Sequence, residues 1–441
     1  MRVATPLLLI LALLGSAQVW AVPSFARQTG MPCSQCHTMA FGPALTAYGR
    51  QFKLNGYVWG DADDPMPLAL MIQGGFTYTA KAQPDPPAPH FATNDNLSVD
   101  QVSLFVATRI TEHLGVFAQG TYSGEDRHTA WDNLDVRYAR ALKFGSTDAI
   151  VGISVNNNPT VQDLWNSTPA WGFPYISSAL APTPAASTLI EGLGQTVLGV
   201  TAYTMIHDRL YLEAGVYRGL SDRWLRNTGL TADDNPNING VAPYWRAALQ
   251  FDQDPHYFSA GIFGIEAKLQ PDPTVADTNR YTDFGFDGTY QYTVGDVGIA
   301  VNATYIHEDQ SLGATFAAAG SNSASNHLDS AKIDASLNYR QTWSASTALF
   351  DISGGTDPTL YTPEPLSGSN SGSPDSRGYI LQFEWVPFGK TDSFGRPWVN
   401  VRTGIQYTGY LRFNGGAANY DGFGRSASQN NTVFLYLWMA L

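Results

Sequence analysis

The sequence predicts an all-β protein, an antiparallel outer-membrane β-barrel of about sixteen strands preceded by a small, partly helical domain. From Leu68 to the C-terminus, apolar and polar residues alternate in short segments, and the links between segments alternate between short and long. Charged residues are only 14% of the chain, against roughly 25% in an ordinary soluble domain. Aromatic residues reach 12%, and no long apolar run follows the first residues. This combination suits a barrel that crosses the membrane with strands.

Residues 1–21 have the features of a secretory signal peptide. Arg2 supplies a positive start, and residues 6–14 form an apolar core that is too short to span a membrane. Val19-Trp20-Ala21 is a small-x-small cleavage site, and Gly15-Ser16-Ala17 is a second candidate. We therefore expect export and a mature chain that begins at residue 22.

The two cysteines of the chain lie together in the pentapeptide Cys33-Ser34-Gln35-Cys36-His37. C-x-x-C-H is the attachment signature of c-type haem. Thiols at this spacing reach two vinyl groups on one edge of the porphyrin, and the following histidine can ligate the iron. A redox C-x-x-C is expected near a βαβ pattern, and structural zinc takes four ligands; neither context is present. We predict one covalent haem c, bound by Cys33 and Cys36, with His37 as the proximal iron ligand.

The second axial ligand of the iron is open at this stage. Methionine is one usual partner of histidine in cytochromes c, and Met66 and Met71 are the better placed methionines along the chain. The other candidates are Met31 and Met39 beside the motif, and His113, His207 and His256 in expected periplasmic turns.

Residues 22–65 are predicted to form the monohaem cytochrome c domain. Residues 43–57 contain a short helix that Gly56 would end, because glycine favours the position after a helix. The polar, proline-containing stretch 61–67 is a linker. Because so short a domain cannot bury a large apolar core, we expect the covalent haem to serve as its core. We expect this domain to act as a plug of the barrel formed by residues 66–441.

The barrel strands are predicted from the alternation of apolar and polar residues, a period of two that is typical of strands with one apolar face. The expected segments are 68–80, 98–110, 113–122, 131–143, 147–156, 193–206, 209–218, 241–252, 256–268, 280–293, 296–307, 328–340, 342–353, 377–387, 398–410 and 430–441.

The links between these segments predict the orientation of the barrel. Long links are expected at 81–97, 157–192, 219–240, 308–327, 354–376 and 411–429. Outer-membrane barrels have short periplasmic turns and long outer loops, so the haem domain lies toward the periplasm or the barrel lumen of a Gram-negative outer membrane. A soluble sandwich or propeller is the alternative, but it does not explain the regular difference in link length.

Polar residues in the segments are expected on the lumen side or in the outer loops. The expected lumen-facing residues are Arg109, Asp135, Arg137, Glu213, Asp334, Glu384 and Arg402. The expected outer-loop acids are Asp85, Asp95, Glu125, Asp126, Asp233, Asp234, Glu308 and Asp309. They could attract a divalent cation, but a polar lumen and solvated loop acids explain them equally. An acidic chain of net charge −13 argues against nucleic acid.

Three stretches carry a family resemblance: Phe25-Ala-Arg-Gln-Thr-Gly30, Cys33-x-x-Cys36-His37 and Leu45-x-x-Tyr48-Gly49-Arg50-x-Phe52-Lys53-x-x-Gly56-Tyr57. They resemble the fused monohaem cytochrome–porins of iron-oxidising bacteria. The motif match covers about residues 23–57, and over 68–441 the similarity is architectural. The resemblance implies an Fe(II)-oxidising cytochrome that passes electrons to a periplasmic cytochrome c or cupredoxin.

The sequence therefore supports three alternative hypotheses about function. The first is an outer-membrane, Fe(II)-oxidising cytochrome–porin with outer-membrane lipid around its barrel. The second is a diffusion porin whose accessory haem serves assembly or sensing. The third is an electron conduit for a donor other than iron.

Overall fold

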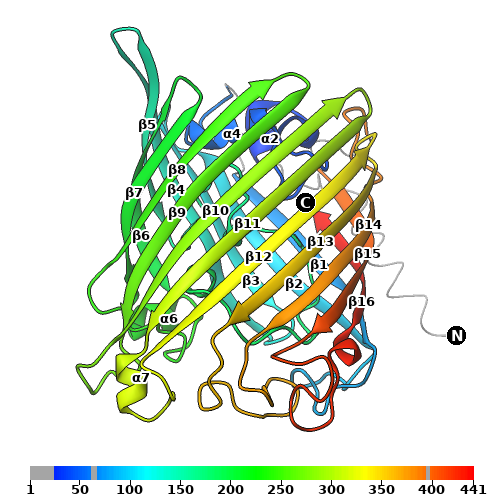
Figure 1. Cartoon of the computed structure of the whole chain (residues 1–441). Helices are drawn as coiled ribbons and strands as arrows, with labels where there is room; N and C mark the ends of the chain where they lie inside the picture. Colours follow the sequence, from blue (N-terminus) through cyan, green and yellow to red (C-terminus); the bar gives the residue numbers. More distant parts are fainter. Residues whose placement is uncertain (1–23, 61–66, 394–397) are drawn as a thin grey trace, which may run out of the picture.

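The computed structural model describes residues 24–60, 67–393 and 398–441. Within these residues, sixteen antiparallel strands form a closed barrel in which each strand pairs with its neighbours in sequence and β1 pairs with β16 (Figure 1). The strands are β1 (Leu68–Thr79), β2 (Asn96–Arg109), β3 (Leu114–Ser123), β4 (His128–Phe144), β5 (Thr147–Asn156), β6 (Val197–Ile206), β7 (Leu210–Gly219), β8 (Ala242–Gln253), β9 (His256–Leu269), β10 (Asn279–Val294), β11 (Val297–Ser311), β12 (Ser325–Tyr339), β13 (Trp343–Gly354), β14 (Ser376–Trp385), β15 (Asn400–Arg412) and β16 (Thr432–Ala440). The predicted antiparallel barrel of about sixteen strands is confirmed.

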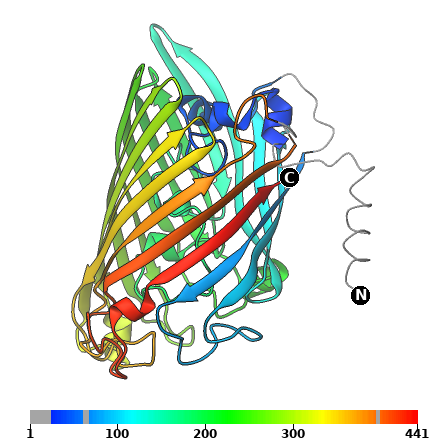
Figure 2. The ribbon, with the colours of Figure 1, turned by 90° about the vertical axis from the view of Figure 1, so that its right-hand side faces the viewer.

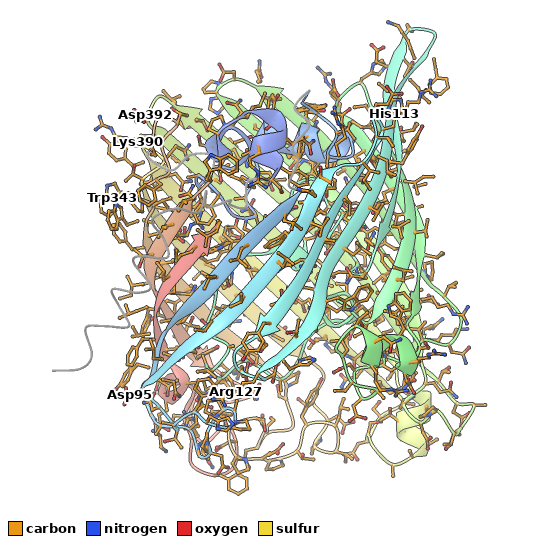
Figure 3. All side chains as sticks on the ribbon, turned by 180° about the vertical axis from the view of Figure 1, so that it is seen from behind. Asp95, His113, Arg127, Trp343, Lys390 and Asp392 are labelled. Atoms are coloured by element: carbon orange, nitrogen blue, oxygen red, sulfur yellow. The ribbon has the colours of Figure 1, made fainter. Side chains whose placement is uncertain are left out.

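The outer face of the barrel is apolar. In β16, Phe434 and Tyr436 are buried toward the lumen, whereas Leu435 and Leu437, which alternate with them, are nearly half exposed. Trp343 (labelled in Figure 3) stacks on its cross-strand partner Trp385 with ring centroids 6.0 Å apart, and both rings lie on the outer face. An even-stranded antiparallel barrel with an apolar outer face is the architecture of outer-membrane proteins. We therefore place the protein in the outer membrane.

The two ends of the barrel differ as predicted. Short turns such as 145–146 and 295–296 lie at one end, and long links such as 220–241 and 355–375 lie at the other. Figure 3 shows His113 at the end with the short turns and Asp95 and Arg127 at the end with the long links. By the usual rule, the end with the short turns faces the periplasm.

The β11–β12 link is shorter than predicted, which corrects two outer-loop residues. Glu308 and Asp309 lie within β11 rather than in the link, because the ladder with β12 continues to Ser311. Glu308 is buried on the lumen side, where its carboxylate accepts a hydrogen bond from the Leu189 amide at 2.5 Å. Asp309 faces outward and is exposed.

Residues 24–60, here called the N-terminal unit, lie in the end of the barrel that has the short turns (Figure 2). They contain the helices α2 (Ser24–Thr29), α3 (Cys33–Cys36) and α4 (Ala47–Leu54). The helix predicted within 43–57 is confirmed: Thr46 caps α4, and Gly56 follows it with a φ of 77°, a conformation that favours glycine. None of the helices in the described ranges is long and apolar enough to cross a membrane.

The connection between β5 and β6, residues 157–196, folds into the lumen and is here called the inward loop. It contains the 3-10 helix η1 (Pro169–Trp171) and the helix α5 (Leu189–Gly192). The sequence indicated an ordinary outer loop at 157–192; the structure differs because the loop's polar groups bond to lumen-facing side chains on many strands. The other long links carry α6 (Asp222–Asn227), α7 (Gly313–Ala317) and η2 (Ala427–Asn430).

Candidate functional site

The C-x-x-C-H motif is built on one short helical turn. Cys33 and Cys36 begin and end α3, and the His37 amide donates to the Cys33 carbonyl at 2.9 Å. The Cys36 carbonyl accepts from the Thr46 amide at 2.9 Å, which fixes α3 against the start of α4. Gly49 of α4 packs directly on this carbonyl, because a Cβ added there would lie 2.2 Å from the Cys36 oxygen. The backbone contact therefore requires glycine.

His37 is held in a form that can ligate a metal. Part of the ring faces a cavity, while protein atoms surround the rest, and this desolvation lowers the pKa of the imidazole to about 4. The imidazole is therefore neutral at neutral pH, as an iron ligand must be. The buried Nδ1 makes no hydrogen bond of ordinary geometry, although the carbonyls of Gly42 and Ala44 lie beside the ring. Those carbonyls are positioned to orient the imidazole, as backbone acceptors do for metal-bound histidines.

Cys33 and Cys36 are not joined by a disulfide, and both border the same cavity. Burial, together with the neighbouring Cys33, raises the pKa of the Cys36 thiol to about 12. The thiol therefore stays protonated in the folded protein, where it is a poor nucleophile.

The cavity is a partly open space of about 510 Å³ lined by three parts of the chain. The N-terminal unit covers it at the end with the short turns, the inward loop lies across it, and the lumen faces of β1–β4, β15 and β16 form its wall. Its volume lies within the roughly 300–1,000 Å³ that is usual for cofactor and ligand cavities. The aromatic lining residues are Phe25, Phe41, Phe52, Tyr57, Phe105, Phe117, Trp171, Tyr175 and Trp438.

The residues around this cavity fit a covalent haem. Two thiols at the required spacing, with no disulfide between them, a neutral imidazole and aromatic side chains border one cavity. Cys33, Cys36 and His37 would hold the group, as the sequence predicts. Across the described ranges of the chain, no group of three or more His, Cys, Asp or Glu side chains could hold a separate metal ion.

Of the proposed second axial ligands, Met71 and Met31 line the cavity. Met39 is buried outside its lining, and Met66 lies outside the described residues. His113, His207 and His256 lie at the periplasmic ends of strands, and none of the three lines the cavity.

Lys53 ties the N-terminal unit to the inward loop. Its ammonium group donates to the carbonyls of Val161 and Asp163 at 2.7 and 2.6 Å and to the Asn166 side chain at 2.8 Å. Lys53 belongs to the stretch 45–57 that carries the family resemblance, but the sequence alone assigns it no role. A lysine beside the apolar stripe of a short helix is the signal that could have identified it, since a buried lysine needs acceptors.

The wall of the barrel meets these two parts through buried ion pairs. Arg137 binds Asp135 at 2.7 Å and also donates to the carbonyls of Lys53 and Gln162. The Tyr57 hydroxyl donates to the same Asp135 carboxylate at 2.7 Å. Residues 53–57 and the inward loop are thus fastened to one strand, β4.

A second cluster fastens the inward loop alone. Arg246 of β8 lies between Asp163 of the loop and Asp287 of β10, at 3.3 and 2.7 Å. The Asp163 carboxylate also accepts from the backbone amides of Ser167 and Thr168. All three charged side chains are almost fully buried.

On the opposite wall, Arg402 of β15 holds the segment after the motif. Its guanidinium donates to the carbonyls of Met39, at 2.8 Å, and Phe41, and it lies 3.4 Å from the Glu384 carboxylate. The predicted lumen orientation is confirmed for Asp135, Arg137, Glu213, Asp334, Glu384 and Arg402, all buried, and for Arg109, whose guanidinium donates to the Gly60 carbonyl.

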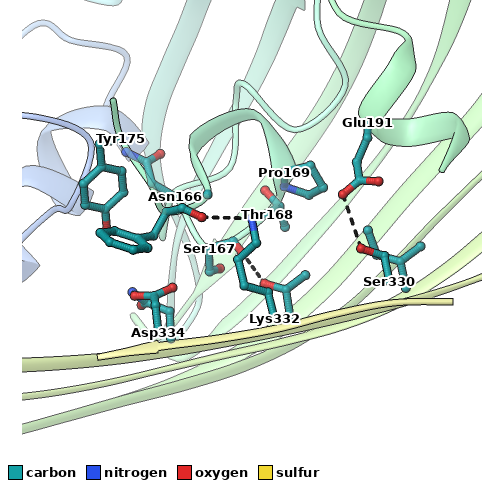
Figure 4. Close-up of a pocket in the computed structure, with 14 residues that line it drawn as sticks. Asn166, Ser167, Thr168, Pro169, Tyr175, Glu191, Ser330, Lys332 and Asp334 are labelled. Carbon is teal, nitrogen blue, oxygen red and sulfur yellow. Dashed lines mark hydrogen bonds between the residues drawn. The ribbon is translucent and has the colours of Figure 1, made fainter. Parts of the chain in front are cut away.

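A small polar cleft of about 30 Å³ separates the inward loop from β11 and β12 (Figure 4). Lys332 donates to the Phe173 carbonyl at 2.8 Å, and Ser330 donates to Glu191 at 3.5 Å. Tyr175 borders both this cleft and the large cavity. The inward loop therefore makes polar contacts with β12 on one side and borders the cavity at the motif on the other.

Comparison with known proteins finds similarity of structure only. No family model and no curated protein matches the chain. The structure is similar to OmpT of Vibrio cholerae (TM-score 0.43, 12% identity, 87% of this chain and 100% of that chain). It is also similar to an anion-selective porin from Comamonas acidovorans (TM-score 0.45, 11% identity, 85% of this chain and 98% of that chain). A third similar structure is OprB of Pseudomonas putida (TM-score 0.47, 10% identity, 85% of this chain and 93% of that chain).

Proposed function

We propose that the protein is an outer-membrane electron conduit, a c-type cytochrome fused to a porin-like barrel. It oxidises extracellular Fe(II) and passes single electrons to a periplasmic carrier, such as a cytochrome c or a cupredoxin. The observation that carries the proposal is the C-x-x-C-H motif on an aromatic-lined cavity inside a membrane barrel. When bound, the haem supplies a one-electron redox centre.

The residues of the chain have separate parts in this function. Cys33 and Cys36 fix the cofactor by thioether bonds, and His37 presents a neutral imidazole. The inward loop separates the cavity from the outer end of the barrel and limits the entry of water. A donor that cannot reach the periplasm would then lose its electron on the outer side, and its oxidised product would stay outside the cell.

The periplasmic side offers access to the motif. An open groove of about 870 Å³ runs between the N-terminal unit and the turns of β8–β15. Ser34 and Gln35, the two residues between the cysteines, line this groove. A soluble carrier that enters it would approach the edge of the cofactor that the thioethers hold.

The test is reduction of the purified protein by Fe(II) under anaerobic conditions. We expect the absorption spectrum of reduced c-type haem to develop in the wild type, and we expect no haem in a Cys33→Ser/Cys36→Ser variant. Haem that is present but never reduced by Fe(II) at any pH would exclude iron as the donor. Reduction by another donor would then support the third function.

A diffusion porin with an accessory haem is the second candidate, and the architecture alone supports it, because it requires only the barrel. The open periplasmic groove favours it in particular. Swelling of proteoliposomes in small sugars measures this activity. Fast swelling that is equal with and without haem would favour the porin.

A further inference from the structure

We propose that Met71 of β1 is the second axial ligand of the haem, so that the iron is held between the N-terminal unit and the barrel wall. The inference deepens the proposed function and rests on it, because it requires a haem on Cys33 and Cys36.

Met71 points into the lumen at the level of the motif. It is 8% exposed, and its ladder partners Ser103 and Ala440 are buried as well. Near the start of the same strand, the Leu68 carbonyl accepts a hydrogen bond from Arg27 of α2 at 2.7 Å. The N-terminal unit is therefore bound to β1 within a few residues of Met71.

The motif and Met71 share one apolar cluster. Cys33 packs against the cluster that contains Met71, Phe41 and Trp438. The rings of Phe41 and Trp438 meet edge to face with centroids 5.2 Å apart, and Trp438 pairs across the ladder with Gln73. A haem bonded at Cys33 would thus lie beside the first residues of β1.

Few other side chains in the lining of the cavity could ligate the haem iron. Haem iron takes imidazole, thioether, thiolate or phenolate ligands. The thiols would be consumed by the thioether bonds. The Tyr57 hydroxyl is committed to Asp135 at 2.7 Å, and Tyr175, whose pKa burial raises, stands on the inward loop and also borders the polar cleft. Among the described residues of the lining, Met31 and Met71 remain.

Met31 is the less suitable of the two methionines. Only Pro32 separates it from Cys33, so its side chain starts at the edge of the porphyrin rather than over the iron. Met71 stands on a separate, rigid strand, and its unbranched side chain can adapt its reach. The side-chain amide of Gln73 already donates to the Met71 sulfur at 3.5 Å, which orients the sulfur on the lumen side.

The ligand is tested by spectroscopy on the full-length protein with its haem, independently of any activity. Ferric haem with methionine and histidine ligands shows a sulfur-to-iron charge-transfer band. We expect Met71→Leu to lose this band, to become high-spin, to bind carbon monoxide when reduced, and to have a lower midpoint potential, since a methionine ligand raises it. Met71→His should restore a low-spin spectrum without the sulfur band.

Two matched variants serve as controls. Met31→Leu removes the rival thioether, and Met439→Leu removes the neighbour that pairs with Ile72. Both should keep the band. Loss of the band in Met31→Leu, its retention in Met71→Leu, or its absence from the wild type would overturn the assignment.

The failure of this inference is distinguishable from failure of the proposed function. The pyridine haemochrome assay counts covalent haem in every variant, and heat-modifiable gel mobility reports the folded barrel. A wild type without covalent haem would overturn the proposed function and this ligand with it. A haem that Fe(II) reduces normally, with a band that persists in Met71→Leu, would overturn the ligand alone.

Discussion

Arg402 shows how much of the N-terminal unit depends on single buried charges. Its guanidinium is fully buried, lies against the Phe41 ring at 4.7 Å, and contacts the Glu384 carboxylate and two carbonyls of the segment after the motif. Truncation of such a group leaves its partner charge buried and unpaired. The residue therefore connects the barrel wall to the cofactor motif.

We expect Arg402→Leu to lower the free energy of unfolding by about 3–5 kcal/mol, because Glu384 is left without its partner. Chemical denaturation in detergent, followed by tryptophan fluorescence, measures the change. The matched control is Arg340→Leu, which removes an exposed pair with Asp296 at 2.8 Å and should change stability far less, because solvent screens the pair. Equal effects of the two variants would contradict the anchoring role.

Helices α3 and α4 form the element on which the candidate site depends. Their contact is made by backbone atoms, since Thr46 and Gly49 both pack on the Cys36 carbonyl. No side chain can be inserted there without moving the cysteine turn away from α4. The sequence shows this glycine in the stretch of family resemblance, but only the packing gives the reason for it.

We expect Gly49→Ala to reduce the yield of covalent haem strongly while the barrel still forms, because the new Cβ would clash with the Cys36 carbonyl. Haem stain and heat-modifiable mobility on one gel separate these two effects. Gly192→Ala is the control, since a Cβ there meets no atom within 4 Å. Normal haem content in Gly49→Ala would show that the contact is not needed for attachment.

At the scale of the whole molecule, the inward loop divides the lumen. It contacts the N-terminal unit through Lys53, β11 through the Thr304 hydroxyl, β12 through Lys332, β15 through Gln406 and β1 through Thr77. These strands lie along one side of the barrel, and Arg137 of β4 and Arg246 of β8 hold the loop on the other side. The loop and the N-terminal unit together oppose free diffusion through the barrel.

We expect low single-channel conductance from the wild type in planar bilayers, because the inward loop obstructs the lumen. Replacement of residues 158–195 by a short Gly-Ser linker should raise the conductance severalfold. A variant in which residues 356–374 are shortened in the same way controls for loop removal at the outer end. A wild type that already conducts like an open porin would disprove the obstruction.

The sequence by itself determined the barrel and the difference between its two ends, and it predicts the three residues that would hold haem. A period of two and alternating link lengths are local properties, and they predict strands and ends without tertiary information. The C-x-x-C-H spacing is likewise local, since the chemistry needs only five consecutive residues.

Only the tertiary structure decided what surrounds the motif. The path of residues 157–196 into the lumen depends on partners far away in sequence, such as Lys53 and Arg246, and its polar composition is that of an ordinary loop. The same applies to Met71, which alternation predicts as one lumen-facing residue among many. Its place on the cavity beside Cys33 follows from the closure of β1 on β16, which brings the first and last strands together beside the site.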